Sequence, residues 1–460
     1  MSFAALDSEL VGPLFATGAM RDVFSDASRL RAMLAAEAAL ARAEARLGLV
    51  PAELAVAIEG IDSAALDVPE LGRATALAGV PTIPFVKAVG AMLPPALEPA
   101  FHKGSTTQDI LDTALVLQMR DGLALLAADA DAVLAGLARL ADAHRATPCV
   151  GRSYGQQAQP VSFGFKVAVW AAGIADAAAG LPVVRAAVLR ASLAGPAGTL
   201  AGLGDHGPAV ADGFADELEL GRSPIGWHVR RGGLAALGAW LAILIGALAK
   251  MATDVADLAS TEVGEAAEPH VPGRGGSSAM PHKRNPVSST VILAAHGAAP
   301  AFASVLIGAV AAQHERPAGA WHAEWHALPS LFGLASGALA EAKALAEGLV
   351  PDEARMRENL GRTRGLLFAD AVAARLAGTL GRERAHALLE RAAGRVREEG
   401  RDLRAILAED PAVAEALGPG GLDDVFDPGP AVRAAAGWID RALDAVAAAR
   451  SALAVGLNER

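Results

Sequence analysis

The sequence contains a single cysteine, Cys149, in 460 residues. One thiol can form no internal disulfide, and its isolation excludes zinc and iron–sulfur sites built from clustered cysteines. Basic residues are also in deficit, because 40 Lys and Arg against 51 Asp and Glu give a net charge of −11. Nucleic acids and anionic membranes bind to basic faces, so we expect no nucleic-acid and no membrane partner. A small anionic substrate is still compatible with this charge, because a local basic pocket can lie within an acidic protein.

Aromatic residues and strand signals are scarce as well. Phe, Trp and Tyr make up 4% of the chain, and no sustained alternation of Val, Ile, Thr and Tyr predicts a strand. Hydrophobic residues reach 53% and charged residues only 20%, which excludes a disordered chain. Ala and Leu favour helices, and small side chains let helices pack closely. The composition therefore predicts an all-α fold of long helices.

Prolines and glycines divide the chain into three predicted units. Residues 1–108 contain short helices interrupted by prolines, which predicts an N-terminal helical domain. Residues 109–350 contain several long helices, and no proline occurs between Gln108 and Thr147, so this part is typical of an extended bundle. Beyond it the helices shorten again, which predicts a C-terminal helical domain over residues 351–460.

One uncharged segment, residues 232–249, is long enough to span a bilayer. We favour a helix buried within a bundle or an oligomer, because the segment continues directly into an acidic helical stretch without an aromatic interface belt. The first residues include Asp7 and Glu9 and no basic residue ahead of an apolar run. They do not have the pattern of a secretory signal, so we expect a cytoplasmic protein.

The strongest local signal is the segment GRGGSSAMPHKRNP, residues 273–286. Its glycines give a flexible backbone, two hydroxyls begin at Ser277, and Lys283 and Asn285 precede the start of a helix. Such a loop can close over an anion and present N–H donors at the helix end. A solvated linker is the alternative, but a linker has no use for the apolar Met280 between two polar clusters.

This loop resembles the signature loop of the fumarase/aspartase superfamily. Residues 102–114, HKGSTTQDILDTA, and residues 151–160, GRSYGQQAQP, resemble the first and second conserved regions of the same superfamily, in the family's order and spacing. The resemblance implies helical domains around a central bundle that a homotetramer pools from its subunits. It also implies composite active sites with one conserved region from each of three subunits, and it implies no metal and no organic cofactor.

The resemblance further implies roles for single residues. Superfamily members add or eliminate a group across a double bond next to a carboxylate, after a base removes the proton alpha to that carboxylate. Ser277 would be this base, or the proton donor in the addition direction, although Ser278 stays an alternative. Lys283 and Asn285 would stabilise the charge that grows on the carboxylate. The expected substrate contacts are His102, Ser105, Thr106, Thr107, Gln108, Ser153, Tyr154, Gln156, Ser278, Met280 and Arg316.

Several of these residues have structural alternatives. His102 can equally be a buried structural histidine, and Thr106 or Thr107 can simply cap the helix that follows. Arg316 can pair bidentately with a substrate carboxylate or form a structural salt bridge with Glu315 or Glu324. These alternatives stay open at the level of the sequence.

The second region departs from the family pattern at Tyr154. Many superfamily members have a histidine at this position, as part of the acid assembly that protonates a leaving hydroxide or amine. A carboxylate leaving group, with a pKa of roughly 4, needs no proton. Tyr154 therefore favours a reaction in which the added or expelled group is a carboxylate, and internal addition of that group makes a lactone. Because residues 313–329 also resemble a segment of the lactonising branch, we expect a cycloisomerase that acts on a small tricarboxylate.

Other functions are less consistent with the sequence. Adenylosuccinate lyase, or another C–N or C–O lyase of the same fold, would need an acid where Tyr154 stands. A non-catalytic helical scaffold would have no need of the intact set of Ser277, Lys283 and Asn285. His322 and His326 are spaced as metal ligands on a helix face, but no third clustered ligand accompanies them.

Overall fold

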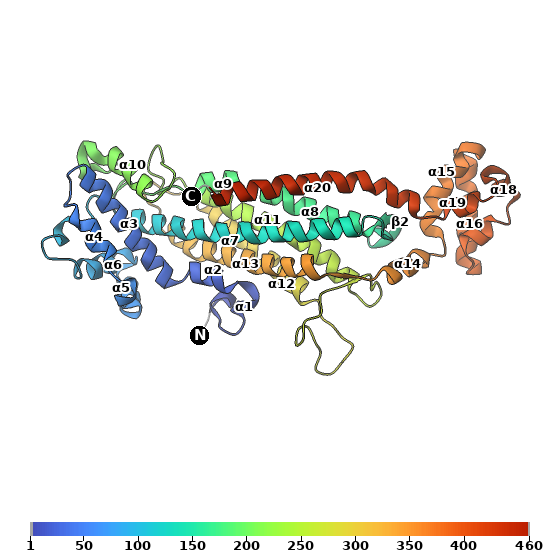
Figure 1. The fold of residues 1–460 in the computed structure, drawn as a ribbon, viewed down its shortest axis with the longest axis horizontal. Coiled ribbons are helices and arrows are strands. Elements are labelled where there is room, and N and C mark those ends of the chain that lie inside the picture. Colours follow the sequence, from blue (N-terminus) through green and yellow to red (C-terminus); the bar gives the residue numbers. More distant parts are fainter. Residues whose placement is uncertain (1–2, 459–460) are drawn as a thin grey trace.

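Long helices dominate the computed structural model, which describes residues 3–458. Six of them lie alongside one another in the central part of the elongated molecule (Figure 1): α7 (Thr107–Ala143), α8 (Phe163–Ala179), α11 (Gly232–Leu258), α12 (Val287–Gly308), α13 (Ala320–Gly348) and α20 (Gly429–Asn458). The predicted all-α fold is confirmed.

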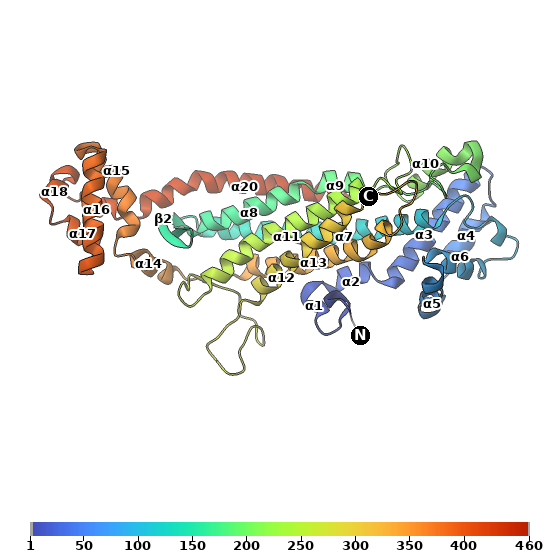
Figure 2. The ribbon, with the colours of Figure 1, turned by 180° about the vertical axis from the view of Figure 1, so that it is seen from behind.

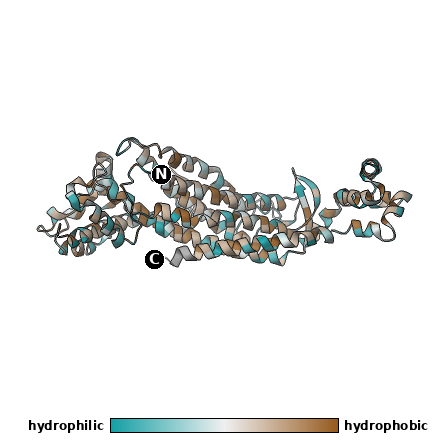
Figure 3. Cartoon of the chain, turned by 90° about the horizontal axis from the view of Figure 1, so that it is seen from above, coloured by the Kyte–Doolittle hydropathy of each residue, from teal (hydrophilic) through white to brown (hydrophobic). Residues whose placement is uncertain are grey.

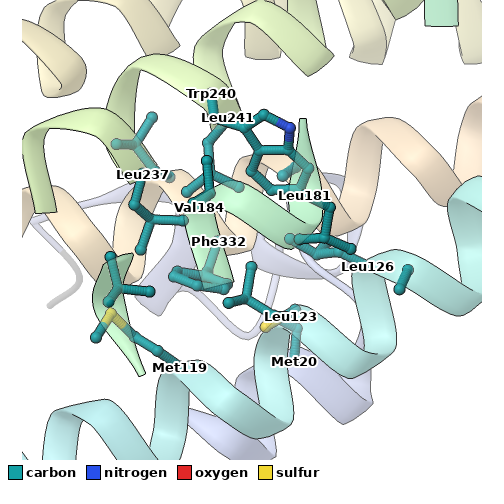
Figure 4. Close-up of a cluster of buried hydrophobic side chains, with 14 of the residues drawn as sticks. Met20, Met119, Leu123, Leu126, Leu181, Val184, Leu237, Trp240, Leu241 and Phe332 are labelled. Carbon is teal, nitrogen blue, oxygen red and sulfur yellow. The ribbon is translucent and has the colours of Figure 1, made fainter. Parts of the chain in front are cut away.

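The core of this bundle is built from Leu, Val, Met and Ala with few aromatic side chains. Figure 4 shows part of it, where Leu123 of α7, Leu237 of α11 and Phe332 of α13 meet. Small residues bring the helices close together, as the composition predicted. A Cβ added at Gly238 of α11 would lie 2.5 Å from the Leu306 Cδ1 atom of α12, so a larger residue there would displace this side chain.

Most helices of the N-terminal part gather at one end of the bundle, whereas the first ones pack alongside α7, α12 and α13 (Figure 1). The helices of this part are η1 (Ala5–Asp7), α1 (Gly12–Phe15), α2 (Gly18–Val23), α3 (Asp26–Arg46), α4 (Glu53–Glu59), η2 (Ser63–Ala65), α5 (Val68–Ala78), α6 (Thr82–Gly90) and η3 (Glu98–Ala100). The connector between α8 and α11 contains α9 (Leu181–Val188), η4 (Ala201–His206) and α10 (Gly207–Glu217). Helix α10 packs on α3, so this connector reaches the same end.

A second group of short helices lies at the opposite end (Figures 1 and 2). It comprises α14 (Glu353–Gly361), η5 (Leu366–Phe368), α15 (Ala369–Leu380), α16 (Arg382–Glu399), α17 (Leu403–Leu407), α18 (Pro411–Leu417) and α19 (Gly421–Val425). Buried residues such as Val372, Leu388 and Leu403 give this group a core of its own. The last helix does not stay with the group, because Ile439, Val446 and other apolar residues of α20 belong to the main core. Residues 351–460 are therefore not one separate unit.

Two small antiparallel ladders interrupt the helices, although the sequence predicted none. Strands β1 (Pro148–Ser153) and β2 (Gln156–Ser162) form a hairpin, and β3 (Ala266–Ala267) pairs with β4 (Val350–Pro351). The hairpin was missed because a bulge between Gly151 and Arg152 and a proline in β2 break any alternating pattern.

Three described segments are long and apolar enough to cross a membrane, by length and composition only: Phe163–Val188, Gly232–Leu258 and Val287–Gly308. In the single chain, 56% of the most apolar window is buried for each of the first two, and 33% for the third. Figure 3 shows the apolar residues distributed along the bundle. Helix α12 thus has much apolar surface that its own chain does not cover.

Candidate active site

The first conserved region forms the turn that leads into α7. Thr106 is the N-cap residue, and its N–H donates a hydrogen bond to Asp109 Oδ2 over 2.9 Å. The buried Asp109 carboxylate also accepts hydrogen bonds from the N–H groups of Ala194 (2.8 Å) and Gly195 (3.0 Å). The capping alternative therefore holds for Thr106. Asp109 fastens the start of α7 to the Gly-rich connector.

A buried glutamate holds His102 in place. His102 Nδ1 lies 2.6 Å from Glu37 Oε1 and 3.0 Å from Ser105 Oγ. Burial disfavours the charged imidazole, but the hydrogen bond and the negative charge of Glu37 outweigh this effect and raise the pKa of His102. His102 also has a φ of 57°, which is uncommon for a residue other than glycine. These features favour the structural alternative for His102.

Gln108 lies in the interior, where it does not face a substrate. Its exposed fraction is 0%, and its Nε2 donates hydrogen bonds to Asp112 Oδ2 (3.1 Å) and to the His228 carbonyl oxygen (3.0 Å). The prediction of a substrate contact is corrected for this residue, because the turn before α11 covers its side chain. Thr107 is half-buried, and its carbonyl oxygen accepts a hydrogen bond from Thr82 Oγ1 (3.2 Å).

The second conserved region is the β1–β2 hairpin. Tyr154 and Gly155 form its two-residue loop, with φ values of 52° and 74°, as a type I′ turn requires. The Tyr154 side chain is fully exposed at the tip. Ser153 and Gln156 pair at the base of the turn and are also exposed. All three predicted contacts in this region therefore project from one end of the hairpin into open space.

Arg152 anchors the hairpin through an ion pair with a buried glutamate. Its guanidinium donates to both carboxylate oxygens of the buried Glu265, over 2.9 and 2.6 Å. Asn359 Nδ2 donates to the same carboxylate over 2.8 Å. Glu265 directly precedes β3, at the start of the segment that leads into the signature loop.

The signature loop is folded on itself by its own polar groups. Lys283 Nζ donates to Asn285 Oδ1 (2.5 Å), and Asn285 Nδ2 donates to the Gly275 carbonyl oxygen (3.1 Å). Ser277 Oγ accepts a hydrogen bond from the Met280 N–H (3.1 Å). The loop, which is mostly exposed, thus carries Ser277, Lys283 and Asn285 together. Ser278 and Met280 of the same loop are also exposed.

The helix end beside this loop is already occupied, contrary to expectation. The N–H groups of Ser288 and Ser289, at the start of α12, donate to the two carboxylate oxygens of Glu268 over 3.0 and 2.9 Å. Glu268 therefore takes the place of an external anion at this N-terminus. The predicted contribution of the α12 helix end to anion binding is wrong in this conformation. The cause is a capping residue about twenty positions upstream, beyond the reach of a local capping pattern.

A cavity of about 540 Å³ opens between the signature loop and the end of α11. Lys283 and Asn285 line it together with Arg274, His282 and Arg284. Arg274 is paired with Glu341. This concentration of cationic side chains in an acidic protein makes the cavity suited to an anion.

Arg316 lies next to the first conserved region. Its Nη2 donates a hydrogen bond to Thr106 Oγ1 (3.3 Å), which joins residues 210 positions apart. The alternative of a salt bridge with Glu324 does not hold, because Glu324 is buried and pairs with Arg231. Thr106 and Arg316 are therefore brought together as two groups that can bind carboxylates.

The three conserved regions do not meet within one chain. The start of α7 lies toward the N-terminal end of the molecule, the hairpin lies at the opposite end, and the signature loop projects from the bundle between them (Figures 1 and 2). Sequence analysis did not identify the acidic residues that hold these regions in place. Glu37, Glu265 and Glu268 act through contacts with distant segments, for which no local motif exists.

The described residues were also compared with the requirements of a metal site. Within residues 3–458, no group of three or more His, Cys, Asp or Glu side chains is arranged to hold a metal ion. His322 packs its ring against Trp321 and Trp325 instead.

Known proteins with similar sequences and structures are enzymes of one family. A family model described as "Lyase" matches residues 15–299, and one described as "Adenylosuccinate lyase C-terminus" matches residues 365–442. The chain is 44% identical to a 3-carboxy-cis,cis-muconate cycloisomerase of Pseudomonas aeruginosa, over 95% of this chain and 96% of that protein. It is also 44% identical to a nitrosuccinate lyase of Streptomyces davaonensis, over 96% and 95% of the two chains.

A solved structure is similar to this chain in both fold and sequence. The 3-carboxy-cis,cis-muconate lactonizing enzyme from Pseudomonas putida superposes with a TM-score of 0.93 at 42% identity, covering 96% of this chain and 100% of that chain. Agreement in fold over nearly the whole length accompanies agreement in sequence. The chain therefore belongs to the lyase family, the fumarase/aspartase superfamily that its three conserved regions indicated.

Proposed function

We propose that this protein is a cycloisomerase that interconverts 3-carboxy-cis,cis-muconate and γ-carboxymuconolactone. The observation that carries the proposal is Tyr154 at the exposed tip of the hairpin, where many superfamily members have a histidine. A carboxylate leaves or attacks as a stable anion, so this reaction needs no acid at that position. The identity of 44% to a cycloisomerase over nearly the whole chain supports the same choice.

The signature loop supplies groups suited to the proton transfer. In the ring-opening direction, Ser277 removes the proton alpha to a substrate carboxylate, the lactone C–O bond breaks, and the released carboxylate keeps the bonding electrons. The Met280 N–H that donates to Ser277 Oγ favours the deprotonated hydroxyl. Lys283 and Asn285 stabilise the charge that develops on the carboxylate next to the reacting carbon. Since that carboxylate accepts the electrons, the proposed reaction uses no metal and no organic cofactor.

Thr106 and Arg316 are the proposed anchors for the carboxylates that do not react. Their hydroxyl and guanidinium groups lie next to each other in the structure. An arginine can bind a carboxylate through two parallel hydrogen bonds, which fixes its orientation as well as its charge. The residues that stay proposed contacts in the assembled site are Ser105, Thr107, Ser153, Tyr154, Gln156, Ser278 and Met280.

We also propose a homotetramer in which three subunits complete each active site. Two observations support it: the conserved regions lie far apart in one chain, and apolar residues of the bundle are uncovered. Ile243 of α11 and Ile307 of α12, for example, are 62% and 56% exposed. Such a tetramer would bury the membrane-length helices among neighbouring subunits, consistent with a cytoplasmic enzyme of protocatechuate degradation.

A second candidate is elimination from nitrosuccinate, because the relative of that name is as similar as the cycloisomerases. The expelled nitrite is also a stable anion, so Tyr154 does not separate the two reactions. Adenylosuccinate lyase is a weaker candidate. The match to its C-terminal part covers residues 365–442, which include none of the predicted site residues.

A parallel assay with 3-carboxymuconate, nitrosuccinate and adenylosuccinate tests these alternatives. We expect loss of the muconate absorbance and no turnover of the other two compounds. Turnover of nitrosuccinate alone would replace the proposal with the second candidate. Turnover of none of the three by a tetrameric, folded preparation would favour the non-catalytic scaffold, and a need for detergent during extraction would favour a membrane protein.

A further inference from the structure

A buried ion cluster connects the three helices that carry or adjoin the proposed carboxylate anchors. Arg231, which precedes α11, donates hydrogen bonds to both oxygens of Asp112 on α7, over 2.6 and 3.2 Å. Its Nε donates to Glu324 Oε1 on α13 over 2.9 Å. Arg231, Asp112 and Glu324 have side-chain exposures of 2%, 2% and 1%. One planar guanidinium therefore holds two carboxylates from different helices, which a lysine could not do with the same geometry.

The cluster continues to the start of α7. Gln108 Nε2 joins Asp112 Oδ2 to the His228 carbonyl oxygen, over 3.1 and 3.0 Å. His228 Nε2 lies 2.7 Å from Asp109 Oδ1, and Asp109 Oδ2 accepts the N–H of Thr106. A continuous chain of hydrogen bonds thus leads from Arg231 to the backbone of the first proposed anchor.

The same cluster reaches the second anchor from the other side. Trp321 is buried at the start of α13, and its Nε1 donates to Asp112 Oδ1 over 3.0 Å. The chain turns there through Gly319, with a φ of 87°, three residues after Arg316. Because Arg316 Nη2 donates to Thr106 Oγ1, the network closes into a ring, with the buried ion cluster on one side and the partly exposed Thr106 and exposed Arg316 on the other.

We infer that Trp321, Arg231 and His228 are positioning residues that set the separation and orientation of Thr106 and Arg316 for a polycarboxylate substrate. The inference rests on the proposed function for the identity of that substrate. The mechanism assigns no chemical step to these buried groups. Gln108 Oε1 and His228 Nδ1 have no partner among the described residues, but the other polar contacts join α7, α11 and α13 in a buried environment, where hydrogen bonds are strong. A shift of either anchor would weaken the binding of carboxylates that do not react, so it would raise KM and leave kcat nearly unchanged.

Substitution of one indole tests this inference with a matched control in the same bundle. Trp321→Phe removes the hydrogen bond to Asp112 and keeps the three charges paired. Trp240→Phe removes a comparable buried indole bond, to the Ala177 carbonyl oxygen, outside the network. We expect similar losses of thermal stability in both variants. Only Trp321→Phe should raise KM for 3-carboxymuconate, by about fivefold, with kcat within about twofold of the wild type.

A second pair of variants and a second readout make the test independent of the substrate. His228→Gln keeps an N–H donor within reach of Asp109, whereas His228→Leu removes it. Hydrogen exchange of residues 104–110 and 312–319 should be faster in Trp321→Phe and His228→Leu, and close to wild type in Trp240→Phe and His228→Gln. If the wild type does not turn over 3-carboxymuconate but exchange follows this pattern, the proposed function fails and the positioning role stands. Unchanged exchange and unchanged KM in Trp321→Phe and His228→Leu would overturn the positioning role.

Discussion

Arg152 and Glu265 form a two-pronged salt bridge that fastens the hairpin of the second conserved region to the base of the signature loop. The carboxylate is fully buried, and the side chain of Arg152 is 15% exposed. Asn359 donates a further hydrogen bond to Glu265. Two regions that carry predicted site residues are thus held by one ion pair at a distance from those residues.

Arg152→Ala should lower the free energy of unfolding by about 3 kcal/mol, because it leaves the buried charge of Glu265 without its cation. Denaturant unfolding measures this loss. Arg145→Ala is the matched control, since its pairs with Asp142 and Asp440 are largely exposed, and it should cost less than about 1 kcal/mol. Equal losses of unfolding free energy in the two variants would mean that the buried Glu265 carboxylate does not need the Arg152 guanidinium to compensate its charge.

Ser277→Ala should abolish turnover and leave the oligomer intact. Removal of a positioned base or acid lowers kcat by roughly 10²–10⁴-fold. The Ser277 hydroxyl makes one local hydrogen bond to the Met280 N–H, so its loss has little structural consequence. Steady-state kinetics and light scattering measure the two effects, and Ser278→Ala tests the alternative hydroxyl one residue away. A nearly normal kcat in Ser277→Ala would mean that a group other than Ser277 transfers the proton.

Glu44→Gln should stabilise the protein more at high pH than at low pH. Burial raises the pKa of Glu44 from the usual 4.5 to about 8, with Glu37 adding to the effect and Lys103 and His102 opposing it. Between these two values the folded chain keeps a proton that the unfolded chain releases, so the free energy of unfolding falls as the pH rises through this range. At about 1.4 kcal/mol per pKa unit, the fall is on the order of 5 kcal/mol.

Thermal melts at about pH 5 and about pH 8.5 measure this dependence. Glu44→Gln should melt close to the wild type at the lower pH and clearly above it at the higher pH. Glu53→Gln, at an exposed position on α4, is the control and should follow the wild type at both pH values. A parallel pH dependence in Glu44→Gln and the wild type would show that Glu44 is ionised in the folded protein.

Local patterns in the sequence predicted the long helices well. The proline-free stretch from Gln108 to Thr147 became α7, Thr107–Ala143, and the uncharged segment became the first part of α11. The β1–β2 hairpin could not be predicted, because its stability depends on the positive φ values of Tyr154 and Gly155 and on the distant Glu265. Neither feature leaves a periodic signal.

The candidate site was predictable where one motif contains all its parts. Ser277, Lys283 and Asn285 share one loop, as expected, and Thr106 caps a helix. The contact between Thr106 and Arg316 was not predictable, because the two residues are 210 positions apart in the sequence. The burial of Gln108 was missed for the same reason, since its partner His228 comes from another element.

Tyr154→Phe tests the leaving-group argument on which the choice of reaction depends. The only group lost is a hydroxyl that stands fully exposed at the hairpin tip. If a carboxylate is the group added or expelled, no proton has to reach it, and kcat should stay within about threefold of the wild type at every pH. Tyr154→Asn is the companion variant, because asparagine tolerates the positive φ of 52° and keeps the turn without the ring. Equal kcat values in all three proteins would assign Tyr154 no chemical role. A loss of about 100-fold in Tyr154→Phe, with activity in the wild type following the protonation of a phenol, would instead make Tyr154 the acid and point to a leaving group more basic than a carboxylate.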